Sequence, residues 1–298
     1  MSKVLTLKYQ EVNMIPVIDF QSETVLDEIR EAYTTMGFAV FTNALPEQDQ
    51  NTMRTWWELM QGFFELDQDT KNKYQYQAEN NLGYSIVGAE NVDPTAPKDM
   101  KESFNYNNSR MPQELWPTSI NRFKATALES IAIADKLTLK ILEKFDTILD
   151  SGNTLVNAHT QMYNTTRVIH YPAMKPTEDN MLRIGEHSDY GTITLLWDIN
   201  GVPGLEVQDI HGNWHHVPYV WNGVVVNIGD LLQRWTNDYF KSTKHRVNND
   251  YCHVPRFSMP HFVDPTPGTI VKNLTTQPDK YAPIESKEYL MWRLAQSY

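Results

Sequence analysis

Residues 183–196 have the sequence RIGEHSDYGTITLL, in which a His-x-Asp triplet is followed by a short, largely apolar run of strand-forming residues. Side chains two residues apart at the end of a strand point to the same side, so His187 and Asp189 could bind one metal ion together. The triplet alone is weak evidence, because 9 histidines and 37 acidic residues in 298 positions produce about 1.1 such triplets by chance. A further ligand is needed to distinguish a metal site from a surface turn.

His245 is the candidate for that further ligand. It follows Asp189 by 56 residues, beyond an apolar strand at 224–228, where a neighbouring strand could return to the same place. Two histidines and one carboxylate form the facial triad of non-haem Fe(II) oxygenases, which leaves coordination positions open for substrate oxygen atoms and O₂. Zinc hydrolases also use two histidines and a carboxylate, but typically as His-Glu-x-x-His on a helix, a motif that this sequence lacks. The pattern therefore favours iron.

A strand shortly after His245 carries a candidate anion clamp. Arg256 begins this strand, and alternation places Ser258 and Phe262 on the same face. A guanidinium and a hydroxyl together suit a carboxylate, because charge-assisted contacts of this kind also fix its orientation. Tyr171 closes another alternating strand, and its phenol could either join the clamp or be a half-buried strand residue.

Residue patterning separates a mainly helical first half from a stranded second half. Helices are predicted at 24–36, 47–66, 122–149 and 286–297. Residues 80–110 are expected to form loops and short strands of the kind that often cap a site. After Gly152 short strands are predicted at 167–171, 192–197, 205–208, 214–217, 224–228 and 256–263. Many closely spaced strands favour a sandwich or jelly roll, so the expected fold class is mainly β with flanking helices.

Composition narrows the class of partner. The net charge of −11 repels phosphate backbones and anionic membrane surfaces, so neither nucleic acid nor membrane is an expected partner. The apolar runs fall far short of the roughly 20 residues that a membrane span requires. The single cysteine, Cys252, cannot form an internal disulfide, and residues 1–6 lack the pattern of a secretory signal. A reducing, cytoplasmic location is therefore predicted.

Several ordered motifs resemble the isopenicillin N synthase-like family of Fe(II)- and 2-oxoglutarate-dependent dioxygenases. They are the 183–196 run, GLEV at 204–207, VNIGDLLQRWTN at 226–237, STKHRV at 242–247 and RFSMP at 256–260. IPVID at 15–19 and Gly37-Phe38 resemble the helical N-terminal region of that family, and Gly83-Tyr84 with KESF at 101–104 matches its bacterial-type members. The resemblance covers nearly the whole chain.

The resemblance implies a domain organisation. A helical N-terminal region would occupy residues 1–155, a double-stranded β-helix (jelly-roll) core would occupy 156–270, and a C-terminal extension with a packing helix would occupy 271–298. The resemblance also implies that His187, Asp189 and His245 bind Fe(II), while Arg256, Ser258 and Tyr171 hold the distal carboxylate of 2-oxoglutarate.

The implied activity is oxidation, with hydroxylation as the usual outcome, of a C–H bond in a small molecule, using O₂ and releasing succinate and CO₂. By position Tyr84, Phe104 and Phe262 are expected near that substrate. Two departures are visible: Ile169 stands where plant members have Asn, and His261 replaces an apolar residue and should face away from the metal. Two alternatives stay open, namely an iron oxidase of the same fold that does not use 2-oxoglutarate, and a catalytically silent small-molecule-binding protein.

Overall fold

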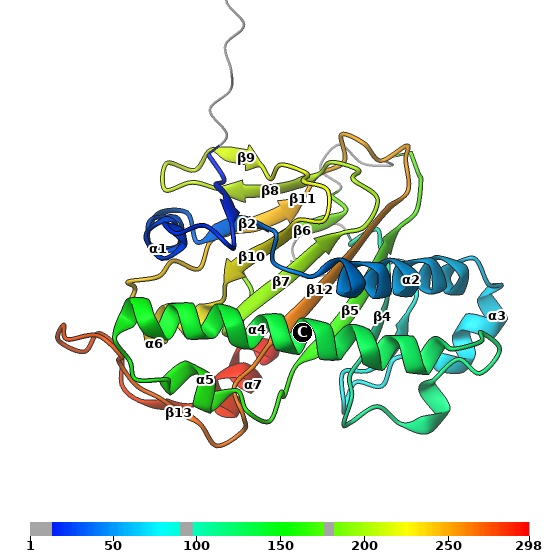
Figure 1. Ribbon diagram of the computed structural model, residues 1–298. Coiled ribbons are helices and arrows are strands. Elements are labelled where there is room, and N and C mark those ends of the chain that lie inside the picture. The colour runs from blue at the N-terminus through cyan, green and yellow to red at the C-terminus, as the bar shows by residue number, and fades with distance from the viewer. Residues whose placement is uncertain (1–13, 90–97, 176–181, 298) are drawn as a thin grey trace, which may run out of the picture.

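The computed structural model describes residues 14–89, 98–175 and 182–297 (Figure 1). Residues 1–6, where no secretory-signal pattern is found, lie outside these ranges. The α-helices are α1 (Val25–Thr35), α2 (Glu47–Phe64), α3 (Gln68–Lys71), α4 (Phe123–Leu149), α5 (Thr154–Ala158), α6 (Asp230–Trp235) and α7 (Ser286–Ser297), with 3-10 turns at Asn72–Tyr74 and Gln113–Leu115. The four predicted helices correspond to α1, α2, α4 and α7. Among the described helices, none combines the length and apolar character needed to cross a membrane.

The strands form two main sheets and a small ribbon. The larger sheet has the order β1 (Val17–Asp19), β2 (Phe38–Thr42), β10 (Val224–Ile228), β7 (Ile193–Asp198), β12 (Arg256–Val263), β5 (Thr165–Tyr171), β4 (Glu102–Tyr106) and β3 (Gly83–Ser85). The smaller sheet has the order β6 (Ile184–His187), β11 (His245–Val247), β8 (Leu205–Gln208) and β9 (Trp214–His216). The ribbon pairs β13 (Ile270–Val271) with β14 (Ile284–Glu285). All six predicted strands are present within one or two residues.

Two apolar layers hold this arrangement together. The first lies between the larger sheet and the helices, where Val168, Leu195 and Met259 pack in one cluster with residues of α2 and α4; Figure 1 shows both helices lying across this face. The second lies between the two sheets and includes Ile169 from the larger sheet and Val207 from the smaller one. Two facing, mainly antiparallel sheets form the predicted jelly roll, with helices covering the outer face of the larger sheet.

Residues of the predicted helical region also contribute strands to this sheet. β2 pairs antiparallel with β10, and β4 pairs antiparallel with β5. The turn from α1 into β2 requires glycine, because Gly37 has a φ of +67° and a Cβ there would lie 2.0 Å from the carbonyl oxygen of Lys241. The sheet therefore crosses the proposed domain boundary at 155/156, and that division stays a prediction.

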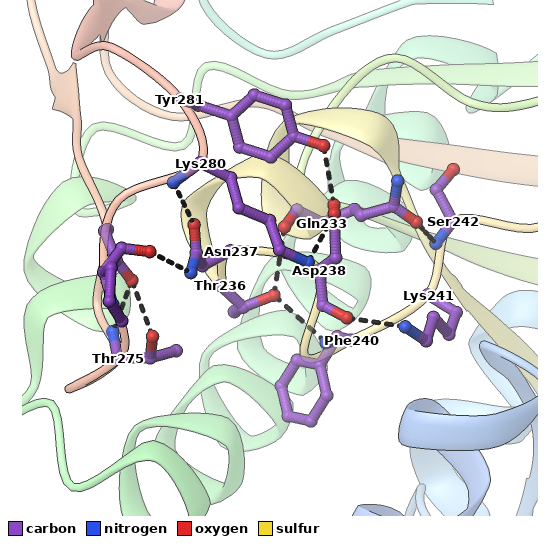
Figure 2. Close-up of polar contacts among 12 residues, drawn as sticks. Gln233, Thr236, Asn237, Asp238, Phe240, Lys241, Ser242, Thr275, Lys280 and Tyr281 are labelled. Atoms are coloured by element: carbon purple, nitrogen blue, oxygen red, sulfur yellow. Dashed lines mark hydrogen bonds and ion pairs between the residues drawn. The ribbon is translucent and has the colours of Figure 1, made fainter.

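The segment that leads from α6 to β11 is tied to the C-terminal part of the chain (Figure 2). Asn237 donates to the carbonyl of Pro278 and accepts from the backbone N–H of Lys280, while the Tyr281 hydroxyl donates to Asp238. The backbone N–H of Ser242 donates to the Gln233 side chain at 2.7 Å. These contacts fix the approach of the chain to His245.

Candidate active site

Three candidate metal ligands meet at one end of the gap between the sheets. His187 ends β6 and His245 begins β11, and the two residues are direct partners in the antiparallel register. The Oδ1 atom of Asp189 lies 3.9 Å from the Nε2 atom of His187 and 3.7 Å from that of His245. The structure therefore brings together the three residues that the sequence singled out.

Backbone carbonyls orient both imidazoles. The Nδ1 atom of His187 lies 2.9 Å from the carbonyl oxygen of Gly185, and that of His245 lies 3.1 Å from the carbonyl oxygen of Thr243. A carbonyl oxygen only accepts hydrogen bonds, so Nδ1 carries the proton in each neutral ring and Nε2 keeps its lone pair. Both lone pairs are thus available for a metal.

The carboxylate of Asp189 is oriented in the same way. Its Oδ2 atom accepts hydrogen bonds from the Thr194 hydroxyl at 2.6 Å and from the Asn227 amide at 2.8 Å. Oδ1, the oxygen that faces the two imidazoles, remains for the metal. Partners of this kind, which hold a ligand in place, strongly influence metal affinity.

The protonation states suit metal binding. Burial, together with the charge that His245 would carry, lowers the pKa of His187 to about 4. Burial by itself would raise the pKa of Asp189, but the two histidines and the hydrogen bonds from Thr194 and Asn227 outweigh it, so this pKa lies below its usual range. Neutral imidazoles and an ionised carboxylate are the ligand forms that a divalent metal ion requires. The donor set, two nitrogens and one oxygen with open positions, fits non-haem Fe(II).

The predicted anion clamp lies on the adjoining wall. Arg256 and Tyr171 are direct partners across β12 and β5, and the guanidinium carbon lies 5.2 Å from the centre of the phenol ring. The Ser258 hydroxyl lies 3.5 Å from that of Tyr171. Arg256 donates through Nε to the carbonyl of Val202 and through Nη2 to Asp198. Within the described ranges no hydrogen bond occupies its Nη1 atom, which leaves a donor for an anion in the cavity.

The triad and the clamp line one cavity of about 540 Å³. Phe262 lines it too, together with Arg256 and Ser258, as the alternation along β12 predicts. His261, the intervening residue, is fully buried on the helical side, where its Nδ1 atom lies 2.8 Å from the Thr166 hydroxyl. The expectation that His261 faces away from the metal is confirmed.

Tyr84 and Phe104, expected near the substrate, are not among the residues that line this cavity. Phe104 is paired with Tyr84 on one side and with Val168 on the other, and paired residues share a face of a sheet. That face is the helical one, where the Phe104 ring lies 5.0 Å from that of Phe63. The register of β4 against β5, which the sequence does not reveal, turns both side chains away from the cavity.

Sequence reasoning did not assign roles to several cavity residues. Asn227 and Thr194 hold Asp189, and Lys101 forms a buried ion pair of 2.8 Å with Asp99 at the cavity wall. The signal for Asn227 is a polar residue within the apolar strand at 224–228. Asp264 also lines the cavity, and extending the alternation of β12 by one step beyond Phe262 would have found it.

Comparison with protein families identifies this architecture. The family described as "2OG-Fe(II) oxygenase superfamily" matches residues 162–265, which contain the three candidate metal ligands and the anion clamp. A second family, described as "non-haem dioxygenase in morphine synthesis N-terminal", matches residues 15–121. The chain belongs to the 2OG-Fe(II) oxygenase superfamily.

Individual members of the superfamily resemble the chain over most of its length. Proline hydroxylase buaE of Petromyces alliaceus is 29% identical over 295 residues, which are 89% of this chain and 91% of the relative. A C-terminally truncated protein of Neurospora crassa, solved in its apo form, is 30% identical, with a TM-score of 0.72, over 86% of this chain and 96% of that one. The full-length form of the same Neurospora protein, solved in complex with alpha-KG and thymine, is 29% identical, with a TM-score of 0.86, over 97% of this chain and 98% of that one.

The chain is therefore a non-haem dioxygenase that uses Fe(II), 2-oxoglutarate and O₂. The sequence left two alternatives open, a 2-oxoglutarate-independent oxidase and a catalytically silent binding protein. Neither is favoured, because the matched family is that of 2OG-Fe(II) oxygenases and its similar members include a 2-oxoglutarate-Fe(II) type oxidoreductase and a structure with alpha-KG bound.

Proposed function

We propose that the chain hydroxylates a C–H bond of a small molecule held in the 540 Å³ cavity, with His187, Asp189 and His245 as the ligands of Fe(II). Arg256, Ser258 and Tyr171 hold the distal carboxylate of 2-oxoglutarate. One observation carries the proposal: the Nε2 atoms of the two histidines and Oδ1 of Asp189 lie close enough together to bind one metal ion, and the same cavity holds Arg256 with an available N–H donor.

The bound iron, with 2-oxoglutarate and O₂, supplies the oxidant: the substrate C–H becomes C–OH while the cosubstrate is converted to succinate and CO₂. The protein's own residues do the positioning. Thr194 and Asn227 keep Oδ1 of Asp189 directed at the metal. The Nη1 donor of Arg256 orients the cosubstrate from its far end, because a guanidinium holds a carboxylate in a fixed plane.

Apolar walls around the triad limit the access of water. The Phe38 ring packs edge-on against His245 at 5.3 Å, and Ile184, Leu205 and Val247 line the same cavity. Exclusion of water strengthens the electrostatic contacts within a site and suppresses side reactions of a reactive oxidant. This wall composition supports a largely apolar cavity in which the oxidation takes place.

A small-molecule substrate is supported by the size of the cavity and by the relatives, one named as a proline hydroxylase and one bound to thymine. The net charge of −11 argues against polynucleotide substrates. We also propose a cytoplasmic location, because the single cysteine, Cys252, cannot form an internal disulfide.

Anaerobic titration of the Fe(II)-loaded protein with 2-oxoglutarate tests the proposal. A visible charge-transfer band is expected in the wild type, is absent in His187→Ala and needs far more 2-oxoglutarate in Arg256→Ala. His216→Ala and Arg30→Ala are matched controls, because both side chains are exposed and outside the cavity lining. Iron binding without a band would refute the role of 2-oxoglutarate, and a normal band in His187→Ala would refute the ligand assignment.

A further inference from the structure

Asp264 places a carboxylate in the wall of the cavity, at the end of β12. It continues the alternation of Phe262, which is paired with Thr165 on the neighbouring strand, and all three residues line the cavity. Its carboxylate lies against the turn that follows Asp189: a Cβ on Gly191 would be 2.6 Å from its Oδ1 atom. Asp264 therefore contacts the chain two residues after Asp189, a proposed metal ligand.

The electrostatic surroundings of this carboxylate are unfavourable to its charge. Within residues 14–89, 98–175 and 182–297, neither a backbone N–H nor a side chain donates a hydrogen bond to Asp264, although its own backbone N–H donates to Asn164. The cation that acts on it electrostatically is Arg110, whose Nη2 atom instead donates to the Asn164 carbonyl and the Thr165 hydroxyl. Partial removal from water raises the pKa of Asp264 to about 6; the charge of Arg110 opposes this rise and that of Asp189 adds to it.

The other charged residues of the cavity wall have partners. Lys101 and Arg256 form ion pairs with aspartates, and Arg167 also has an interaction partner. Asp189 would be neutralised by the metal. Asp264 is partly exposed, and it lines the cavity, so its carboxylate oxygens are accessible to a ligand there. A carboxylate that no protein group pairs is available to bind a cationic donor. Asp264 is the cavity acid whose partner has still to be found.

We propose that the substrate is a small protonated amine whose N–H groups donate to the carboxylate of Asp264. This inference rests on the proposed function and specifies its substrate class. An ammonium group supplies both the donor and the charge that would complement Asp264, whereas a hydroxyl supplies a donor only and a carboxylate supplies neither. The lining of Phe262, Leu290 and Met291 is apolar and suits the hydrocarbon part of such an amine.

Three probes of one shape test this proposal: 3-methylbutylamine, 3-methylbutan-1-ol and 3-methylbutanoate. Their dissociation constants are measured by anaerobic calorimetry on the full chain loaded with Fe(II) and 2-oxoglutarate. A hydrogen bond between two ionised groups corresponds to about tenfold to hundredfold in affinity. The wild type is expected to bind the amine at least about tenfold more tightly than the alcohol, and the carboxylate most weakly.

Asp264→Asn keeps the shape of the side chain and removes its charge, so the preference for the amine is expected to disappear. Asp264→Glu keeps the charge and is expected to retain a preference. Leu196→Val is the matched control, because it alters the cavity wall without a change in charge and is expected to keep the preference for the amine. The proposal is overturned if the wild type shows no preference for the amine, or if Asp264→Asn keeps it.

The charge-transfer band with 2-oxoglutarate is recorded in the same wild-type sample before the probe is added. A band without amine preference refutes the role of Asp264 and leaves the proposed function in place. Absence of the band refutes the proposed function itself. Circular dichroism confirms that each variant is folded before its affinities are compared.

Discussion

Replacing Thr194 by valine should weaken metal binding without removing any metal ligand. The substitution is nearly isosteric and deletes the hydroxyl that donates to Oδ2 of Asp189 at 2.6 Å. The remaining donor to that oxygen is Asn227, at 2.8 Å. With a single hydrogen bond to Oδ2, the carboxylate is less firmly held with Oδ1 towards the two histidines.

The size of the effect follows from the burial of Asp189, which is 9% exposed and so has little access to replacement water. A hydrogen bond to a charged group contributes roughly 1.5–3 kcal/mol, and partners that orient metal ligands typically change metal affinity by about 10–100-fold. We therefore expect Thr194→Val to bind Fe(II) about tenfold or more weakly than the wild type.

The assay is an anaerobic competition of the protein with a chelator for Fe(II), performed on the wild type and the variant. Thr126→Val is the matched control, because Thr126 is also a buried threonine but lies in α4, and its hydroxyl has no hydrogen-bond partner among the described residues. If Thr194→Val binds Fe(II) as tightly as Thr126→Val does, the carboxylate does not depend on this hydrogen bond and the reasoning is wrong.

Three further predictions concern the clamp, the core and the far side of the sheet. Arg256→Lys keeps the positive charge but loses the planar guanidinium with its paired donors, so the dissociation constant for 2-oxoglutarate should rise about tenfold or more. An unchanged dissociation constant in the anaerobic titration would contradict the role of Arg256 in binding 2-oxoglutarate. Burial lowers the pKa of His159 to about 4, below the 6.5 of the unfolded chain, so the free energy of unfolding should fall by up to about 3 kcal/mol as the pH drops from 6.5 towards 4. Urea unfolding at pH 7.5 and pH 5 should show a smaller loss of stability in His159→Gln than in the wild type, and equal losses would show that His159 is not its cause. Glu102 accepts hydrogen bonds from Lys71 at 2.8 Å and from His170 at 2.8 Å on the helical side, so Glu102→Gln should reduce the free energy of unfolding by about 3–5 kcal/mol. A free energy of unfolding near that of the wild type, measured by chemical denaturation, would show that the ion pair of Glu102 with Lys71 is dispensable.

The sequence by itself determined most of the local structure. Periodicity identified the four long helices and six strands, because burial of one face imposes a repeat of 3.6 or 2 on the apolar residues. Within one strand the same repeat correctly grouped Arg256, Ser258 and Phe262 and excluded His261. These features depend only on neighbours in the chain.

Tertiary structure alone decided how the faces meet. The register of β4 against β5 turned Tyr84 and Phe104 into the helical core, and β2 joined the sheet from a region predicted to be mainly helical. Spacing placed His245 among the candidate ligands, but only the pairing of β11 with β6 sets it opposite His187. The surroundings of Asp264 are likewise a property of the assembled cavity. Strand register depends on contacts between residues far apart in the chain, and a shift by one residue reverses every face, so local pattern cannot specify it.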